Sequence, residues 1–171
     1  MLGVPIKLDL NEIIEFPGAS VPFSCELEEE ALTNASVIGF SEPPRATGEV
    51  RNTAGAITLT GELVALMRCV CDRCGDVFET EKRMALSVPL AADLTDEENA
   101  DIFPIEENAI DLTEVLETVF LLDLETKFLC REDCKGLCDR CGANLNRGPC
   151  NCGPEVDPRM AVLGQLLDNI E

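Results

Sequence analysis

The chain has 171 residues, with 13 Lys or Arg against 33 Asp or Glu, so its formal charge is −20. This acidic balance argues against a broad duplex-binding surface, and the absence of His excludes Ser-His-Asp catalysis and His-ligated zinc or haem. Hydrophobic residues make up 46% of the chain, enough for a sizeable core, so one domain with at most a small appendage is expected.

No targeting or membrane-spanning segment is expected. Lys7, Asp9 and Glu12 interrupt the apolar positions at the start of the chain, which excludes the core of a signal peptide. No apolar run approaches the roughly 20 residues of a membrane span. We therefore expect a cytoplasmic protein without a membrane partner. In that reducing compartment, closely spaced Cys residues indicate a metal site more often than a disulfide framework.

Residues 35–90 are typical of β-strands, which we expect to form an antiparallel meander. Strand-like runs at 47–51 and 57–71 flank Asn-Thr-Ala-Gly, which is a hairpin-turn signal. Apolar and polar residues alternate along 57–71, as in a half-buried strand. A further strand is expected at 21–27 and another at 77–90, whereas the Ser-Glu-Pro-Pro sequence at 41–44 predicts a break.

Residues 91–125 contain twelve acidic residues and no Lys or Arg. An exposed loop is expected at 95–108, followed by a helix at about 111–126 with Asp111 as its cap. Its apolar residues recur at helical spacing, which predicts one buried stripe. The acidic residues have two interpretations: a solvated surface, or a salt-sensitive docking surface for a basic protein. The stripe consists of Leu112, Val115, Leu116, Val119 and Leu122.

The sequence Cys-Asp-Arg-Cys-Gly occurs twice, at 71–75 and at 138–142. Two Cys separated by two residues place both sulfurs on one side of a tight turn, and the Gly can take a positive φ. The second copy is followed by Cys-x-Cys, which gives four thiols within fifteen residues. This spacing predicts a compact Cys₄ zinc site, with metal-free Cys as the alternative. Its ligands would be Cys138, Cys141, Cys150 and Cys152.

Four more Cys form two half-sites: Cys71 and Cys74 at a hairpin tip, and Cys130 and Cys134 after the helix. Together they predict a second Cys₄ site that would join the sheet to the helix end. Two alternatives stay open, namely a redox role for the first pair, or exchange of Cys130 or Cys134 into the other site. The predicted cofactor is therefore Zn²⁺, about two structural ions per chain.

The remaining thiols, Cys25 and Cys69, lie among apolar residues and are predicted to be buried hydrophobes. Basic residues return beside the clustered Cys. They would either compensate the thiolate charge or contact RNA phosphate or a partner. No aromatic side chain accompanies them, so RNA recognition by base stacking is not supported. These residues are Arg131, Lys135, Arg140 and Arg147.

No catalytic constellation is visible, because there is no phosphate-binding Gly-rich loop, no nucleophile elbow and no His. A Cys₄ site is closed, and a metal-dependent hydrolase would need a non-Cys ligand or a bound water. We therefore expect no enzymatic activity. The alternative to a binding protein is a Cys-x₂-Cys thiol redox or zinc-sensing switch.

Three stretches together resemble the YceD family, named for large ribosomal RNA subunit accumulation. They are the strand ending in Cys-x-x-Cys-Gly at 66–78, the Ile-Asp-Leu at 110–112 that leads to Cys130, and residues 134–152 with the following Asp157-Pro158-Arg159. The C-terminal Cys cluster is similar to that of the Gram-positive-type branch.

The resemblance implies a non-enzymatic role in the synthesis, processing or stability of 23S ribosomal RNA. The implied partner is a ribosomal protein or a large-subunit assembly intermediate, with limited ribosomal RNA contact and no DNA. Members are often encoded beside a small zinc-ribbon protein of the large ribosomal subunit. The recurrent Cys-x₂-Cys of the family maps onto Cys71 and Cys74.

The expected fold class is α+β: an antiparallel β-meander packed by one long helix, with a Cys-rich zinc-bound C-terminal segment and a short final helix beginning at Asp157. Residues 1–128 would form the core domain. Residues 129–171 would form the Cys-rich segment and C-terminal helix, packed on the core.

Overall fold

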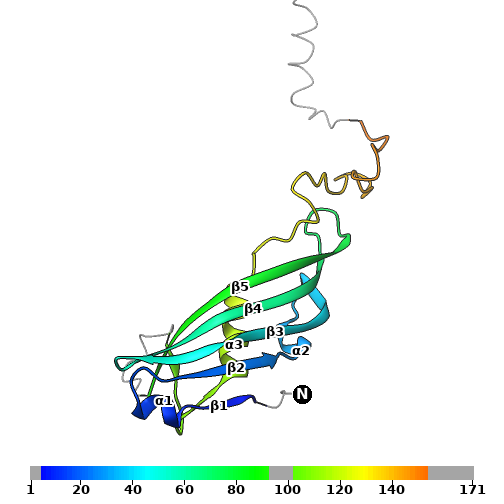
Figure 1. The fold of residues 1–171 in the computed structure, drawn as a ribbon. Coiled ribbons are helices and arrows are strands. Elements are labelled where there is room, and N and C mark those ends of the chain that lie inside the picture. Colours follow the sequence, from blue (N-terminus) through cyan, green and yellow to red (C-terminus); the bar gives the residue numbers. More distant parts are fainter. Residues whose placement is uncertain (1–4, 93–101, 154–171) are drawn as a thin grey trace, which may run out of the picture.

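The computed structural model describes residues 5–92 and 102–153 (Figure 1). Strands dominate this part of the chain, and its helices are few and short. The elements in chain order are β1 (Lys7–Asp9), α1 (Asn11–Glu15), β2 (Ser20–Glu26), α2 (Glu29–Leu32), β3 (Val37–Thr53), β4 (Ala56–Val70), β5 (Val77–Ala91), β6 (Phe103–Pro104), β7 (Ala109–Asp111) and α3 (Leu112–Leu122).

The main sheet has the order β2-β3-β4-β5-β6, and β1 pairs with β7 in a separate two-stranded sheet. The pairs from β2 to β5 are antiparallel, which confirms the predicted meander. The short pair β5–β6 is parallel, so the sheet as a whole is mixed. The connection between β4 and β5 is the first Cys-Asp-Arg-Cys-Gly turn, at one end of the sheet (Figure 1).

The β3–β4 hairpin forms at the predicted turn, where Gly55 donates its backbone N–H to Asn52 Oδ1 at 2.8 Å. The break expected at 41–44 is wrong, because β3 runs through these residues. Pro43 and Pro44 cannot donate to the ladder, and the strand accommodates them with register shifts between Phe40 and Arg45. The strand therefore bends without ending.

One face of the sheet carries the core. Alternate residues of β4, including Leu59, Leu63 and Met67, are almost fully buried, as the period-two pattern predicted. They belong to one apolar cluster with the buried residues of α3. The rings of Phe40 in β3 and Phe120 in α3 are 6.1 Å apart, so the helix packs on the bent part of the hairpin.

The prediction that one long helix packs the sheet is not supported. α3 has 11 residues and ends at Leu122, short of the expected 126. Leu122 is 79% exposed, whereas Phe120, outside the predicted stripe, is fully buried. The cap is confirmed, because Asp111 Oδ1 accepts the Thr113 N–H at 3.0 Å. The core cluster also includes buried residues of the N-terminal segment, namely Leu10, Ile13 and Leu32.

The helix expected from Asp157 and residues 95–101 of the expected acidic loop lie outside the described residues. None of the helices in the described ranges has the length and apolar composition that a membrane crossing needs.

Candidate metal centres and their surroundings

The eight clustered Cys form two groups of four thiols, and within each group the sulfur atoms lie within 4.8 Å of one another. The first group joins the β4–β5 turn to the segment after α3, as predicted, and consists of Cys71, Cys74, Cys130 and Cys134. The second consists of Cys138, Cys141, Cys150 and Cys152. No exchange of ligands between the two groups occurs.

The sulfur spacing of the first group fits a tetrahedral metal. A tetrahedron with metal–sulfur bonds of about 2.3 Å has edges of about 3.8 Å. The Sγ atoms of Cys71 and Cys134 are 3.8 Å apart, and those of Cys74 and Cys130 are 3.7 Å apart. A disulfide would require about 2.05 Å, and all ten Cys are free. The donor set is soft and closed, which is typical of structural zinc.

The two groups differ in exposure. Cys71, Cys74 and Cys134 are buried, and only Cys130 is partly accessible. In the second group Cys138 is buried, whereas Cys141 is exposed. Outside both groups, Cys25 and Cys69 lie in the apolar core, which confirms the prediction that they are buried hydrophobes.

The first knuckle, residues 71–76, has a defined backbone hydrogen-bond pattern. The Cys71 N–H donates to the carbonyl of Asp76 at 2.9 Å, and the Gly75 N–H donates to the carbonyl of Cys71 at 2.9 Å. Gly75 has φ 72°, a conformation that a Cβ would disfavour. The turn thereby brings the two thiols to one side of the hairpin tip.

The second knuckle, residues 138–143, repeats this pattern position by position. The Cys138 N–H donates to the carbonyl of Ala143 at 2.8 Å, and the Gly142 N–H donates to the carbonyl of Cys138 at 2.9 Å. Gly142 has φ 69°. The two copies of the motif are therefore the same structure, although only the first joins two long strands.

The Asp and Arg inside the first knuckle hold the segment that supplies the other two thiols. Asp72 exchanges two hydrogen bonds with Phe128: its backbone N–H donates to the Phe128 carbonyl at 2.9 Å, and its Oδ2 accepts the Phe128 N–H at 2.6 Å. Arg73 Nη1 donates to the Cys134 carbonyl at 3.0 Å, and the Arg73 carbonyl accepts the Leu137 N–H at 3.1 Å.

Polar side chains also tie the second knuckle to the first. Asp76 accepts from Asn144 Nδ2 at 2.7 Å and from Arg147 Nη2 at 2.8 Å. Asn146 Nδ2 points at Cys134 Sγ at 3.3 Å. Of the side chains in this network, the sequence indicated Arg147 only as a possible contact for RNA or a partner, and it did not indicate the roles of Asp76, Asn144 and Asn146 or those of Asp72 and Arg73. The repetition of Asp-Arg inside both motifs was the available signal.

The thiols of the first group differ in pKa, which is lowered for Cys71 and raised for Cys74. Burial opposes ionisation of Cys71, but backbone N–H groups such as those of Cys130 and Arg73 outweigh it, so the pKa of Cys71 falls to about 6. The Asp76 N–H favours the Cys74 thiolate, but burial and the neighbouring thiols raise the pKa of Cys74 to about 12. The metal-free group therefore holds thiolate and thiol together, and a divalent cation would replace the retained protons.

The second group shows the same split. Hydrogen bonds from the backbone N–H groups of Cys141 and Arg140 lower the pKa of Cys138 to about 7. The contact with the Cys141 side chain, together with burial, raises the pKa of Cys152 to about 12. Both knuckles thus present one preformed thiolate on a turn whose N–H groups face the sulfur.

Two of the four predicted basic residues lie beside carboxylates. Arg147 is bound to Asp76 at 2.8 Å, and Arg131 lies 3.5 Å from Asp133. Lys135 and Arg147 line one shallow open pocket. In the described ranges Arg140 has no ion-pair partner.

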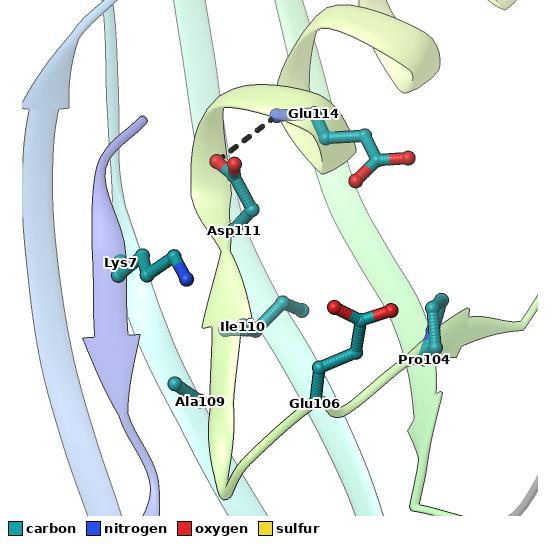
Figure 2. Close-up of a pocket in the computed structure, with 7 residues that line it drawn as sticks. All are labelled: Lys7, Pro104, Glu106, Ala109, Ile110, Asp111 and Glu114. Carbon is teal, nitrogen blue, oxygen red and sulfur yellow. Dashed lines mark hydrogen bonds between the residues drawn. The ribbon is translucent and has the colours of Figure 1, made fainter. Parts of the chain in front are cut away.

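An acidic pocket lies at the other end of the fold, where β1, β6, β7 and the start of α3 meet (Figure 2). Glu106, Asp111 and Glu114 contribute carboxylates, and Lys7 contributes the single ammonium group. Asp111 also caps α3, as the dashed line in Figure 2 shows. The remaining lining residues are Pro104, Ala109 and Ile110.

Both Cys groups lie in the part of the chain that matches a known protein family. The family model described as large ribosomal RNA subunit accumulation protein YceD matches residues 59–167, which include all eight clustered Cys. Uncharacterized proteins of Mycobacterium tuberculosis and Mycobacterium leprae are each 25% identical over 170 residues, covering 95% of this chain and 82% and 78% of those proteins.

A plant relative matches a shorter stretch. The chloroplastic large ribosomal RNA subunit accumulation protein YCED homolog 1 of Arabidopsis thaliana is 36% identical over 70 residues, covering 40% of this chain and 22% of that protein. No solved structure matches the chain.

Proposed function

The chain belongs to the YceD family, and from this premise we propose that it is a non-enzymatic factor that supports the synthesis, processing or stability of 23S ribosomal RNA in the cytoplasm. It acts by binding a ribosomal protein or a precursor of the large subunit. The observation that carries the proposal is the family match over residues 59–167, which is described by large ribosomal RNA subunit accumulation. The geometry of the Cys groups adds a means of holding the binding surface rigid.

In this proposal each Cys group holds one structural Zn²⁺. The tetrahedral sulfur spacing and the all-thiol donor set support this assignment. When bound, the ion cross-links chain segments and supplies no open coordination position. The first site fixes residues 130–134 to the β4–β5 tip, and the second fixes residues 150–152 to the second knuckle. Zinc therefore substitutes for a core in a segment that has little secondary structure.

The proposed organisation is a core of residues 1–128 and a Cys-rich part of residues 129–171. In Figure 1 the described residues after 129 lie beyond the β4–β5 end of the sheet. Hydrogen bonds from Asp72 and Arg73 support a fixed attachment at this junction. The Cys-rich part would thus be presented at a defined angle to a partner.

The acidic surface supplies the partner chemistry. With a formal charge of −20 and a pocket in which three carboxylates face one ammonium group, the chain favours a basic protein. Ribosomal RNA contact would be limited to phosphate near Arg131, Lys135, Arg140 and Arg147. Since Arg147 and Arg131 already lie beside carboxylates, this contact would be secondary.

Depletion of the protein in its source organism tests the proposal. The expected result is a lower ratio of 23S to 16S ribosomal RNA, together with co-purification of large-subunit precursors on the tagged chain at low salt. High salt should release them, because screening weakens the attraction between exposed charges. An unchanged ratio, with no ribosomal protein recovered at low salt, would contradict the proposal.

A second candidate function is a thiol redox or zinc-sensing switch, which the exposure of Cys141 favours. The burial of Cys71 and Cys74 argues against the form of this hypothesis that uses those two thiols. A switch predicts rapid, reversible oxidation with release of one zinc ion from the second group. A structural site predicts slow alkylation of all eight thiols until a chelator is added.

A further inference from the structure

The two knuckles share one backbone geometry, but within the described residues only the Asp-Arg pair of the first knuckle forms hydrogen bonds to another chain segment. Its Asp72 and Arg73 bind residues 128–137 through four hydrogen bonds, all to backbone groups of that segment. Three of these bonds use a backbone group of Asp72 or Arg73 or the Asp72 carboxylate. The fourth joins the Arg73 guanidinium to a carbonyl. Together, this Asp-Arg pair and its turn form a clamp for the peptide groups of a neighbouring segment, which turns between Arg131 and Cys134.

The second knuckle presents the same pair, Asp139 and Arg140, at the same positions of the same turn. Both residues are exposed. Across the described ranges, neither makes the hydrogen bonds to another segment that Asp72 and Arg73 make, and Asp139 Oδ1 has only the Cys138 thiol at 3.8 Å. Leu137, which precedes this knuckle, is 48% exposed.

We propose that the second knuckle is a peptide clamp that binds a peptide segment of a partner protein through Asp139 and Arg140. The partner's anchor residue would take the place that Phe128 has at the first knuckle, with its N–H on the Asp139 carboxylate and its carbonyl on the Asp139 N–H. A carbonyl further along would accept from Arg140. An apolar side chain of the partner would cover Leu137.

The chemistry of the pair selects a peptide rather than a phosphate. A carboxylate at Asp139 repels an anion, whereas it accepts a backbone N–H, as Asp72 does at 2.6 Å. The guanidinium of Arg140 can donate to either ligand, but only a peptide satisfies the donor and the acceptor of the pair together. The cationic side chain therefore takes part in backbone recognition, as Arg73 does.

The test uses the full zinc-loaded chain and a phage-displayed library of random linear dodecapeptides, so it does not depend on ribosomal material. The variants are Arg140→Ala and Asp139→Asn. The matched control is Arg68→Ala, which removes the same charge from an exposed position on β4. Elemental analysis checks that each variant keeps the zinc content of the wild type.

The expected result is a set of enriched peptides whose affinity falls about tenfold or more in both variants and stays unchanged in the control, because each variant removes the charge that strengthens a hydrogen bond to the peptide. Three results would overturn the proposal: no enrichment, enrichment that does not depend on Asp139 and Arg140, or an Arg140 variant that loses only binding to poly-uridylate RNA.

Amide hydrogen exchange of the free full chain is the second measurement. The Asp139 N–H should exchange fast in the free protein and slowly with an enriched peptide bound, while the Asp72 N–H, bonded to Phe128, should be slow in both. Slow exchange of Asp139 in the free chain would mean that the protein fills its own clamp, and would overturn a role in binding a partner. A loss of ribosome association with intact peptide binding would separate this inference from the proposed function.

Discussion

At the scale of single residues, the surroundings of each Cys decide its role. Cys69 continues the buried face of β4 and lies in the apolar core, where a thiol serves as a small hydrophobe. Cys71, two residues further on, lies where the strand becomes a turn, and backbone N–H groups favour its thiolate. Strand periodicity and Cys spacing predicted both roles, because each depends on short-range sequence. The Asp72 and Arg73 contacts could not be predicted, because their partners lie more than 50 residues away.

The ligand assignment predicts separate losses of metal. Cys74→Ser and Cys141→Ser should each lower the zinc content from about two ions to about one per chain, because each removes one of four ligands. Cys25→Ala should keep both ions. Elemental analysis gives the zinc, and amino-acid analysis gives the protein concentration, since the chain has no Trp or Tyr. Equal zinc contents in all three variants would contradict the assignment.

A buried ammonium group marks the end of α3. Lys82, 9% exposed, donates to the carbonyl of Asp123 at 2.7 Å and to Glu125 at 3.2 Å. Lys82→Met keeps the apolar stem but removes these bonds, so the free energy of unfolding should fall by about 1–2 kcal/mol, since the partners are half exposed. Urea unfolding followed by circular dichroism measures the difference. Lys127→Met, at an exposed position, is the control.

The difference in stability between the wild type and Lys82→Met should depend on pH. Burial lowers the pKa of Lys82, but the hydrogen bonds to Asp123 and Glu125 outweigh it, so the pKa of Lys82 is raised above 10.5. A raised pKa in the folded state stabilises the protein fully below the unfolded value and is lost as the pH rises through the folded value. The stability gap between wild type and Lys82→Met should therefore be constant near neutrality and shrink above pH 10.5. A gap that grows with alkali would contradict this assignment.

At the scale of elements, local sequence patterns predicted the strands better than the helix. Alternation along β4 is repeated over many residues and matches burial, so the strand was predictable. The end of α3 depends on Lys82, which lies 41 positions earlier in the chain and binds the carbonyl of the residue after the helix. No pattern within 111–126 contains that information. The buried Phe120 was missed because the predicted stripe continued to Leu122.

Two glycines face each other in the antiparallel pair of β3 and β4. Gly48 is paired with Gly61, and a Cβ on Gly61 would lie 2.3 Å from the Thr47 carbonyl oxygen and 2.8 Å from the Gly48 Cα. Gly61→Ala should therefore lower the free energy of unfolding by about 3 kcal/mol, because backbone atoms cannot move aside as a flexible side chain can. Thermal unfolding followed by circular dichroism measures the loss. Gly153→Ala, where a Cβ meets none of the described residues within 4 Å, should leave the midpoint unchanged.

At the scale of the whole molecule, the pairing of the Cys groups was predictable, but their mutual arrangement was not. Counting half-sites predicted the two groups that the structure brings together. The network from Asp76 to Asn144 and Arg147 spans some 70 residues and has no local signature. The same applies to the acidic pocket, whose Lys7 lies about 100 residues from its carboxylates. These contacts appear only once the chain is folded.

Chelation should separate the Cys-rich part from the core. Between residues 129 and 153 the chain has no helix or strand and only two buried Cys and one buried Gly, so its order depends on the proposed metal ions. A strong chelator should make trypsin cut after Lys127, Arg131 and Lys135, which are exposed, while the zinc-loaded chain resists.

Arg51 and Arg83 lie in the central strands and should stay uncut in both states, with the β-sheet circular dichroism retained. Mass spectrometry identifies the cuts. Equal cleavage of the sheet after chelation would mean that the core of residues 1–128 does not fold without zinc, and that the ions stabilise the whole protein rather than its Cys-rich part.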